Sequence, residues 1–382
     1  MVFVVFLAFA FVLPFMPLYV RELGVEDEGT AALWAGVLIG VSPLLAGLLA
    51  PVWGRLADRY GHRPMALRAL GAYVFILALS GMVTAPWQLL VLRIAVGLFG
   101  GIGPLGLAMA TSLAPREETG KAVGLIQSAQ ILSAAIGPFA GGLLAEMITI
   151  RGTFIVTSIL CAAAFLLIFL FYQEAPPARP ETAKTSRCFR QVLGLPQVLP
   201  LLLVLFLVNF IGRSFTPILP LHLQRLGMPT RGLALATGIL ISVYSMAAAV
   251  SALAAGRLSR RYSPSQLLIA SLVGGALFVA PMAIAPSFAS FLALATLLGL
   301  TAGGSLTLCY TIGGLSVPED RRTTAFGFFS GAALFGGSVS PSVAGLIAHA
   351  DLRGIYLVDA ALYLAVAIGL LRMPRVTAPA NG

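Results

Sequence analysis

Charged side chains are scarce in this sequence of 382 residues: Asp, Glu, Lys and Arg together make up 10% of it. Soluble domains carry about 25% charged residues, so a water-soluble fold would have too few polar side chains to cover its surface. The mean hydropathy is +0.97. Apolar runs of about 20 residues, long enough to cross a hydrocarbon core, recur along the chain. Alternating ten-residue segments, typical of membrane-spanning strands at about that length, are absent. The sequence therefore predicts an all-α membrane protein.

Other absences exclude classes of function. The chain has 3 cysteines (Cys161, Cys188 and Cys309), whose spacing fits neither a metal site nor a disulfide framework. It has no Walker A, H-E-x-x-H or G-x-S-x-G pattern, which argues against ATP-driven transport and the common membrane hydrolases. A G-x-G-x-x-G string at 101–106 lies inside an apolar run without a preceding strand, so it does not indicate a nucleotide site. We expect no enzymatic activity, no cofactor and no metal.

Turn and charge signals divide the chain into twelve apolar stretches. They cover 2–20, 32–53, 64–84, 87–110, 121–147, 151–172, 198–221, 233–256, 264–286, 287–312, 323–347 and 352–372. The first stretch has no basic segment before it and no small-residue cleavage site, so we interpret it as a span and not as a removable signal. Residues 173–197 are polar and rich in proline and basic residues, and they predict a cytoplasmic linker. The expected domains are a six-helix bundle over 1–172, this linker, and a second six-helix bundle over 198–382.

The basic residues indicate the orientation. Of the 24 Lys and Arg residues, 17 fall in one set of loops and 5 in the other, while Arg93 and Arg213 lie inside spans. Positive charge stays on the cytoplasmic side, so both termini are expected there, in a plasma (inner) membrane protein. The formal net charge of +10 then has a topological role, and we expect no nucleic-acid partner.

The two halves of the chain repeat at an offset of 202 or 203 residues. The segment 14–18 (PFMPL) aligns with 217–221 (PILPL), and 54–56 (GRL) recurs as 256–258. Gly97 and Gly101 correspond to Gly299 and Gly303, and Pro138 corresponds to Pro341. A duplicated six-helix unit predicts two bundles with a substrate path between them.

Three segments resemble motifs of one family. Residues 54–63 (GRLADRYGHR), between the second and third spans, resemble the signature loop of the major facilitator superfamily. Residues 93–97 (RIAVG) resemble the span-four motif of its proton-coupled members, and 137–142 (GPFAGG) resemble the motif of its drug:proton antiporters. The resemblance implies the twelve-span major facilitator fold and points to the multidrug-efflux branch. Two departures are His62 in place of a basic residue, and a first span without any charge.

The resemblance implies roles for these residues. The signature loop implies a conformational latch, in which a glycine at the end of span two permits close helix approach and a carboxylate faces a helix N-terminus. Its members here are Gly54, Asp58, Arg59, Gly61 and Arg63. The antiporter motif loosens span five and allows tight packing, because proline removes a backbone hydrogen bond and glycine removes bulk. Its members are Gly137, Pro138, Gly141 and Gly142.

A few polar residues inside spans are candidates for coupling or binding. Arg93 either faces a partner or a water-filled cavity, or extends to the headgroup region; Arg213 raises the same alternatives. Asp359, in span twelve, either carries the transported proton or neutralises an arginine such as Arg213. Further candidates for the substrate cavity or its gate, besides Arg213, are Asn209, Gln127, Gln130 and Tyr244.

The function that the sequence favours is proton-coupled export of amphipathic small molecules by alternating access. A metabolite facilitator or proton symporter on the same fold is the alternative, although a sugar symporter is expected to carry more acids and amides in its central spans. The expected partners are a small-molecule substrate, protons and the lipid bilayer. One chain supplies both halves, so a monomer suffices.

Overall fold

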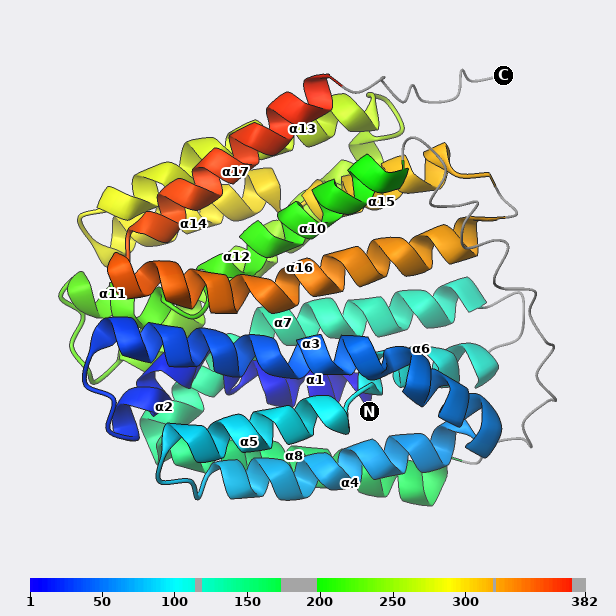
Figure 1. Ribbon diagram of the computed structural model, residues 1–382, viewed down its shortest axis with the longest axis vertical. Coiled ribbons are helices and arrows are strands. Elements are labelled where there is room, and N and C mark those ends of the chain that lie inside the picture. Colours follow the sequence, from blue (N-terminus) through cyan, green and yellow to red (C-terminus); the bar gives the residue numbers. More distant parts are fainter. Residues whose placement is uncertain (114–118, 173–197, 319–320, 373–382) are drawn as a thin grey trace. The chain divides into compact units, whose positions relative to one another are not determined.

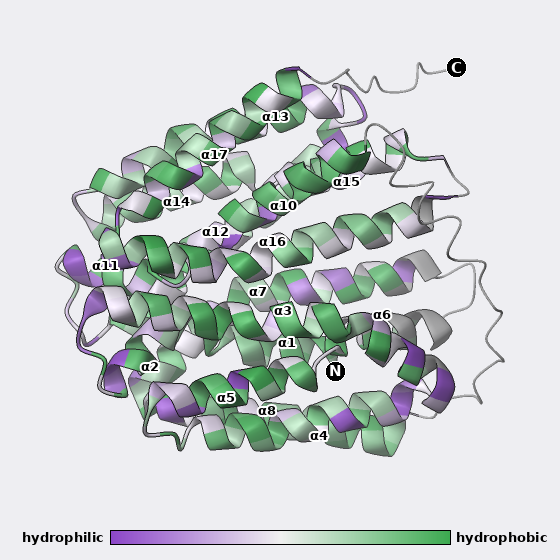
Figure 2. Cartoon of the chain, in the orientation of Figure 1, coloured by the Kyte–Doolittle hydropathy of each residue, from purple (hydrophilic) through white to green (hydrophobic). Residues whose placement is uncertain are grey.

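The computed structural model describes residues 1–113, 119–172, 198–318 and 321–372. Ten helical spans in these residues are long and apolar enough to cross a membrane, and Val198–Ser214 with Leu219–Arg225 form one more span that is bent by 43°. The remaining predicted span, 87–110, consists of two shorter helices. Figure 2 shows hydrophobic residues along the helices and hydrophilic ones mainly toward their ends. The prediction of an all-α membrane protein is confirmed.

The helices follow the predicted spans in order. Those of the first half are α1 (Val2–Ala10), the 3-10 helix η1 (Leu13–Phe15), α2 (Met16–Glu22), α3 (Glu28–Tyr60), α4 (His62–Ser80), α5 (Pro86–Leu98), α6 (Ile102–Leu113), α7 (Thr119–Ile148) and α8 (Ile150–Phe171). Those of the second half are α10 (Val198–Ser214), α11 (Leu219–Arg225), α12 (Leu233–Leu258), α13 (Pro264–Val279), the 3-10 helix η3 (Ala280–Ile284), α14 (Phe288–Ala302), α15 (Ser305–Ser316), α16 (Arg322–Ala350) and α17 (Gly354–Leu371). Figure 1 shows them in chain order from blue to red.

Two compact units result from the packing of these helices. Unit 1 contains Met1–Glu181 and Pro217–Ser242, and unit 2 contains Thr182–Thr216 and Val243–Gly382. The segment Pro217–Ser242, which the sequence assigns to the second half, belongs to unit 1 because α11 packs against α2 and the start of α12 packs against α7.

The internal repeat appears in the helix bounds. Helices α2 and α11 coincide at an offset of 203 residues. Two positions beyond the end of each lies a glycine with positive φ, +96° at Gly24 and +85° at Gly227. The amide of the residue after this glycine donates to the carbonyl five positions earlier, from Val25 to Val20 at 3.4 Å and from Met228 to Leu223 at 3.3 Å. This capping pattern satisfies carbonyls that a helix end would otherwise leave unpaired.

Span four breaks between α5 and α6 at Gly101, whose φ is +106°. A break within a membrane leaves carbonyls without helical partners, and neighbouring side chains have to supply them. Trp53 Nε1 donates to the Leu98 carbonyl at 2.9 Å, and Arg68 Nη2 reaches the Phe99 carbonyl at 3.3 Å. The Arg68 guanidinium lies 3.4 Å from the centroid of the Trp53 ring. Side chains of α3 and α4 therefore donate hydrogen bonds to the carbonyls at the end of α5.

At the corresponding position of the second half, smaller side chains form the hydrogen bonds to the backbone. Ser271 Oγ donates to the Thr301 carbonyl at 2.6 Å, and Thr301 corresponds to Phe99 at the offset of 202 residues. Ser251 Oγ accepts a hydrogen bond from the Gly304 amide at 3.0 Å. In both repeats, a side chain of the preceding span therefore donates a hydrogen bond to the carbonyl at this position.

Helix α7 packs backbone against backbone at the predicted antiporter motif. A Cβ added at Gly137 would lie 2.3 Å from Ala10 Cβ, and one added at Gly141 would lie 2.5 Å from the Phe11 backbone. One added at Gly142 would lie 2.6 Å from the Ala234 carbonyl oxygen. No side chain fits at these three positions, so glycine is required where α7 meets the end of α1 and the start of α12.

Pro138 adds a specific hydrogen bond to this contact. Proline interrupts the helical ladder, and the next amide, that of Phe139, donates to Ser242 Oγ of α12 at 3.0 Å. Facing it, a Cβ added at Gly238 would lie 2.2 Å from the Pro138 carbonyl oxygen. The motif therefore combines close approach with a polar link between α7 and α12.

Replacing Arg68 by alanine is expected to lower the free energy of unfolding by about 1–2 kcal/mol, because a charge-assisted hydrogen bond and a cation–π contact are lost. Arg68→Lys keeps the charge without the planar stacking and should recover only part of this loss. Thermal unfolding in detergent measures the effect, with the exposed Arg257 changed to alanine as control. Equal stability of the Arg68→Ala and Arg257→Ala variants would contradict the role given to Arg68.

Gly141→Ala is expected to destabilise the protein by about 1–3 kcal/mol, because the methyl group overlaps the Phe11 backbone and the helices have to separate. Gly124 lies in the same helix, and a Cβ there meets nothing within 4 Å. Gly124→Ala should therefore leave stability unchanged or raise it by up to about 1 kcal/mol through helix propensity. The same unfolding measurement compares the two variants, and similar values for both would show that the close contact is unimportant.

Candidate functional site

The predicted latch loop differs from its sequence interpretation at the first glycine. Helix α3 does not end at Gly54 but continues to Tyr60, and a Cβ added at Gly54 would meet nothing within 4 Å. Among the described residues of unit 1 no neighbouring helix lies close to Gly54, and the predicted close approach stays a prediction. The side chain of Asp58 lies outside the described residues, so its predicted role at a helix N-terminus stays a prediction.

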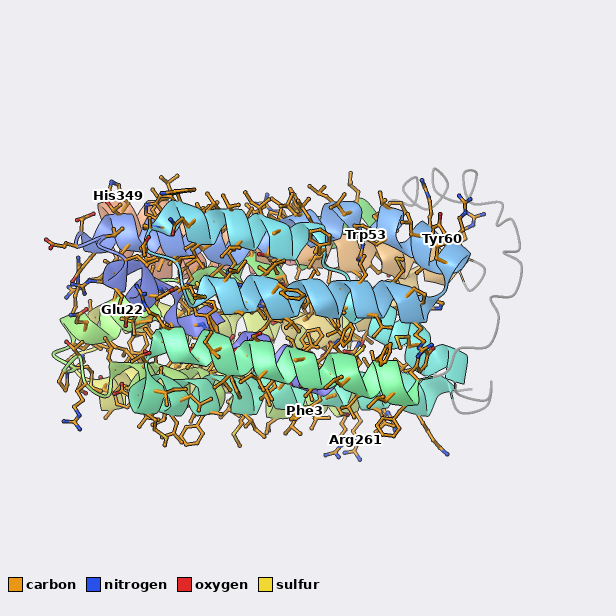
Figure 3. The ribbon with its side chains drawn as sticks, turned by 90° about the horizontal axis from the view of Figure 1, so that it is seen from below. Phe3, Glu22, Trp53, Tyr60, Arg261 and His349 are labelled. Atoms are coloured by element: carbon orange, nitrogen blue, oxygen red, sulfur yellow. The ribbon has the colours of Figure 1, made fainter. Side chains whose placement is uncertain are left out.

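The remaining latch residues form a tight turn. Gly61, with φ +93°, is the one residue between α3 and α4, and this conformation favours glycine. The Arg59 guanidinium lies 5.3 Å from the centroid of the Tyr60 ring, and Arg63 Nη2 donates to the Phe169 carbonyl at 2.7 Å. Arg63 thus ties α4 to the end of α8. Figure 3 shows Trp53 and Tyr60 toward one end of unit 1, which we call the Tyr60 end, and Glu22 at the opposite end, the Glu22 end.

Arg93 is buried inside unit 1, with only 2% of its surface exposed. Its Nη2 atom lies 3.6 Å from the Met16 sulfur, and its guanidinium lies 6.0 Å from the centroid of the Phe154 ring. The carbonyl of the same residue accepts from Ser42 Oγ at 2.6 Å, which fixes α5 against α3. Among the described residues no carboxylate pairs with Arg93, and its Nε atom has no hydrogen-bond partner. The guanidinium is enclosed by protein.

Asp359 is the corresponding buried acid of unit 2, with 0% of its surface exposed. Its Oδ2 atom is in hydrogen-bonding contact with Ser214 Oγ, at the end of α10, and its Oδ1 atom has no partner among the described residues. Ser214 Oγ also lies 2.8 Å from the Ile211 carbonyl oxygen. A serine hydroxyl has a single proton, so it can donate to only one of these two acceptors. When it donates to Ile211, the contact with Asp359 requires a proton on the carboxyl group.

The other polar candidates of unit 2 form no hydrogen bond or ion pair with this acid among the described contacts. Arg213 is exposed, and its neutralisation by Asp359 stays a prediction. Tyr244 packs edge-on against Phe215, with ring centroids 5.3 Å apart. Asn209 Oδ1 lies 2.5 Å from the position of a Cβ at Gly337. Helices α10, α12 and α17 therefore bring Asn209, Arg213, Tyr244 and Asp359 into one unit.

Gln127 and Gln130 lie on α7 of unit 1, exposed and half-buried respectively. No hydrogen bond of either side chain is among the described contacts. Their predicted place in the substrate cavity stays a prediction.

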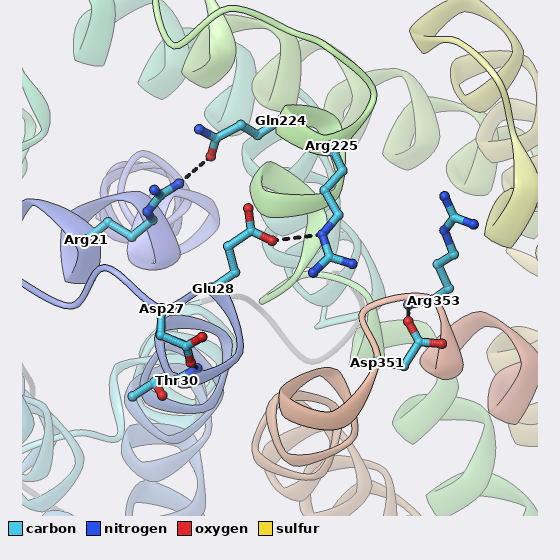
Figure 4. A network of polar contacts seen from close by, with 8 residues as sticks. All are labelled: Arg21, Asp27, Glu28, Thr30, Gln224, Arg225, Asp351 and Arg353. Atoms are coloured by element: carbon cyan, nitrogen blue, oxygen red, sulfur yellow. Dashed lines mark hydrogen bonds and ion pairs between the residues drawn. The ribbon is translucent and has the colours of Figure 1, made fainter.

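A polar cluster at the Glu22 end of unit 1 was not predicted. Glu28 Oε2 accepts from Arg225 Nε at 2.8 Å, and Arg21 donates to the Gln224 side chain. Figure 4 shows both contacts, which join α2 and α3 to α11. Glu146, near the end of α7, accepts from the Gly232 amide at 2.9 Å.

The site residues that sequence reasoning missed are mostly hydroxyl groups. Ser42, Ser214 and Ser242 each bind a group on another helix, but serine is common in this chain and its spacing carries no signal. Arg21 and Arg225 were counted only among the basic loop residues that predict the topology, and Glu28 was given no role. A pairing of the two repeats through aligned loops, 21–28 with 224–231, could have suggested the cluster.

Comparison with known proteins agrees with this architecture. The family model described as Major Facilitator Superfamily matches residues 1–238 and 232–382. The Multidrug resistance protein MdtG of Salmonella heidelberg is 30% identical over 364 residues, covering 94% of this chain and 90% of the relative. The protein of the same name from Yersinia enterocolitica is 33% identical over 307 residues, covering 80% of this chain and 74% of the relative.

Solved structures share the fold at low sequence identity. A bacterial homologue of the human lysosomal transporter Spinster, in an inward-facing and occupied conformation, matches with a TM-score of 0.78 at 15% identity, covering 97% of this chain and 94% of that one. A D-xylose–proton symporter matches with a TM-score of 0.77 at 15% identity, covering 98% of this chain and 96% of that one. From the helices, the repeat, the motifs and these matches together, the chain belongs to the major facilitator superfamily and is a multi-pass secondary transporter of the membrane.

Proposed function

We propose that this transporter exports amphipathic drugs or similar small molecules in exchange for protons, and that Asp359 carries the proton. The observation behind this proposal is the buried contact of Asp359 with Ser214, in which one hydroxyl proton serves two acceptors. The substrate class is supported by relatives that are named multidrug resistance proteins. The fold leaves direction and substrate open, because a D-xylose–proton symporter shares it.

The chemistry of the proton step follows from burial. An ionised carboxylate without a cation in contact is expensive in an apolar interior, and proton uptake removes that cost. In the protonated state the carboxyl group donates to Ser214 Oγ, which donates to the Ile211 carbonyl. On deprotonation the hydroxyl turns to the carboxylate, and the Ile211 carbonyl loses this partner. The protonation state of Asp359 is thereby linked to the end of α10, next to Arg213 and the bend before α11.

The groups that each unit offers for binding in this proposal include few fixed charges. Within unit 2, Asn209, Arg213 and Tyr244 offer polar points on α10 and α12. Within unit 1, Gln127 and Gln130 offer amides on α7. Phe206, Phe210 and Phe335 form a ring cluster beside Asn209, with centroid separations of 6.1 Å and 5.8 Å. Aromatic rings around a small number of polar groups suit apolar molecules of varied shape.

The Glu22 end is the outer end if both termini are cytoplasmic, as the distribution of basic residues predicts. The contacts Glu28–Arg225 and Arg21–Gln224 then close the outer ends of α2, α3 and α11 together. They would have to separate in an outward-open state and re-form afterwards. At the Tyr60 end, the latch residues Gly54, Asp58, Arg59, Gly61 and Arg63 would have the matching role on the cytoplasmic side.

The experiment that tests the proposal is uptake of a fluorescent lipophilic dye by energised inside-out vesicles, with and without a protonophore. Asp359→Asn is expected to lose at least about tenfold of the protonophore-sensitive uptake, because the amide cannot carry a proton. Downhill dye exchange, which needs no proton movement, should continue in that variant.

Asp351→Asn is the matched control, since Asp351 is an exposed acid that caps the loop before α17. Ser214→Ala should shift the pH at which uptake is half-maximal without abolishing uptake. Unimpaired proton-driven uptake in Asp359→Asn would rule out Asp359 as the carrier. Equal dye uptake by the unmodified protein with and without the protonophore would refute proton coupling itself.

Charge reversal tests the outer contact. Glu28→Arg places a like charge opposite Arg225, so it is expected to hinder closure and lower uptake by about two- to fivefold, in keeping with the modest energy of an exposed ion pair. Arg225→Glu should act similarly, and the double exchange should restore uptake. The deficit of the single variants should shrink in high salt, which screens exposed charges. Additive losses in the double variant would show that the pair does not act as a contact during transport.

A further inference from the structure

Arg93 is a buried cation that pairs with no anion among the described residues of unit 1. The described acids of unit 1 lie at or beyond helix ends, at Glu22, Glu26, Asp27, Glu28 and Glu146, and none of them pairs with this guanidinium. A guanidinium stays protonated at all physiological pH values, so it cannot escape the cost of burial by losing a proton. Its repeat counterpart is the buried Ala295, which shows that the fold does not need an arginine at this position.

The groups around Arg93 cover it without neutralising it. The Met16 thioether is a weak hydrogen-bond acceptor on a flexible side chain, and it directly follows the 3-10 turn that interrupts the first span. The Phe154 ring lies at the outer limit of a cation–π distance. Tyr19 packs against Phe154 with ring centroids 5.1 Å apart, and its hydroxyl donates to the Ser80 carbonyl at 2.7 Å. An apolar, aromatic wall thus adjoins an unneutralised positive charge.

We infer that Arg93 binds the anionic group of the transported molecule, so that the substrates are amphipathic organic anions such as carboxylates, sulfonates or phosphonates. The guanidinium pairs with the anionic head, Phe154 and Tyr19 contact the apolar body, and Met16 moves aside to admit the ligand. At such a site arginine differs from lysine because its planar guanidinium can donate two hydrogen bonds to one anion. This inference rests on the proposed export function and specifies its substrate class.

Cationic substrates fit these residues poorly. A lipophilic cation needs a carboxylate or an electron-rich cage free of positive charge, and unit 1 presents a buried arginine among its described span residues instead. In unit 2 the exposed Arg213 adds another positive side chain, and the buried Asp359 is already in contact with Ser214.

The test is equilibrium binding to the full chain in nanodiscs, at pH 7.5 and in gluconate buffer. Three probes share a dansylamino-undecyl body and end in a carboxylate, a methyl ester or a trimethylammonium group. The carboxylate is expected to bind about 10- to 100-fold tighter than the ester, which corresponds to one charge-assisted hydrogen-bonded contact. In Arg93→Met this preference should vanish while ester binding persists.

The controls separate a binding role from a structural one. Arg151→Met removes an exposed arginine of the same unit, near Phe154 in sequence, and should keep the carboxylate preference. Arg93→Met should unfold at the same or a higher temperature than the parent, because an unneutralised buried charge is removed. Saturating carboxylate probe should raise the unfolding temperature of the parent and not that of Arg93→Met. If Arg93→Met does not fold, Arg93→Lys serves, with a reduced but measurable preference.

Three results would overturn the inference. The first is an unchanged carboxylate preference in Arg93→Met, and the second is tightest binding of the trimethylammonium probe. The third is stabilisation of the parent by chloride alone with no advantage of the carboxylate over the ester, which would indicate an inorganic-anion site. The binding assay uses no proton gradient, so its outcome does not depend on proton coupling. A loss of the carboxylate preference would contradict this inference and leave proton-driven dye uptake unaffected. A loss of proton-driven dye uptake would contradict the proposed function and leave the carboxylate preference unaffected.

Discussion

Backbone amides and carbonyls inside a hydrocarbon layer have no water to bind, and each irregularity of these helices is shaped by that constraint. At the break of span four, Trp53 and Arg68 supply donors to the carbonyls at the end of α5. At the corresponding break in the second half, Ser271 Oγ donates to the Thr301 carbonyl and Ser251 Oγ accepts from the Gly304 amide. Breaks that give a transporter its bending points are therefore stable only where a neighbouring span carries a suitable donor.

The same constraint applies to side chains, and it makes Arg93 and Asp359 informative. Both are almost fully buried, and neither is held in an ion pair among the described residues. A structural role would be served better by an apolar residue or by a complete pair. The two repeats also differ here, since the arginine occurs in the first half and the acid in the second. The helices are therefore common to both repeats, whereas Arg93 and Asp359 each occur in one repeat alone.

The fold followed from the sequence because its signals are long and redundant. Apolar runs set the spans, and the repeat offset of 203 residues predicts the bounds of α11 from those of α2. The antiporter motif was also predictable, since glycines at 137, 141 and 142 indicate close packing whatever the partner helix is. Gly54 shows the limit of that reasoning: a glycine permits close approach but does not cause it, and no described residue lies within 4 Å of a Cβ placed there.

The polar contacts of the site were harder to predict. Ser214 meets Asp359 across 145 positions of sequence, and a single hydroxyl gives no periodicity to detect. The exposed pair Glu28–Arg225 spans 197 positions, and its members look like ordinary loop charges. Sequence reasoning placed Arg93 and Asp359 inside spans, and both side chains are buried. It could not decide what surrounds them, because that depends on helix rotation within each unit.

Under the proposed function, the burial of Asp359 within a span also has an electrical consequence. Proton uptake changes the charge of a carboxyl group by one elementary unit, whatever its neighbours are. In the proposed exchange, each proton that passes through Asp359 therefore moves a full elementary charge within the membrane field. A charge that crosses the whole membrane gains about 2.3 kcal/mol per 100 mV. Voltage, at equal pH on both sides, then contributes driving force to the proposed exchange whenever the cycle moves net charge.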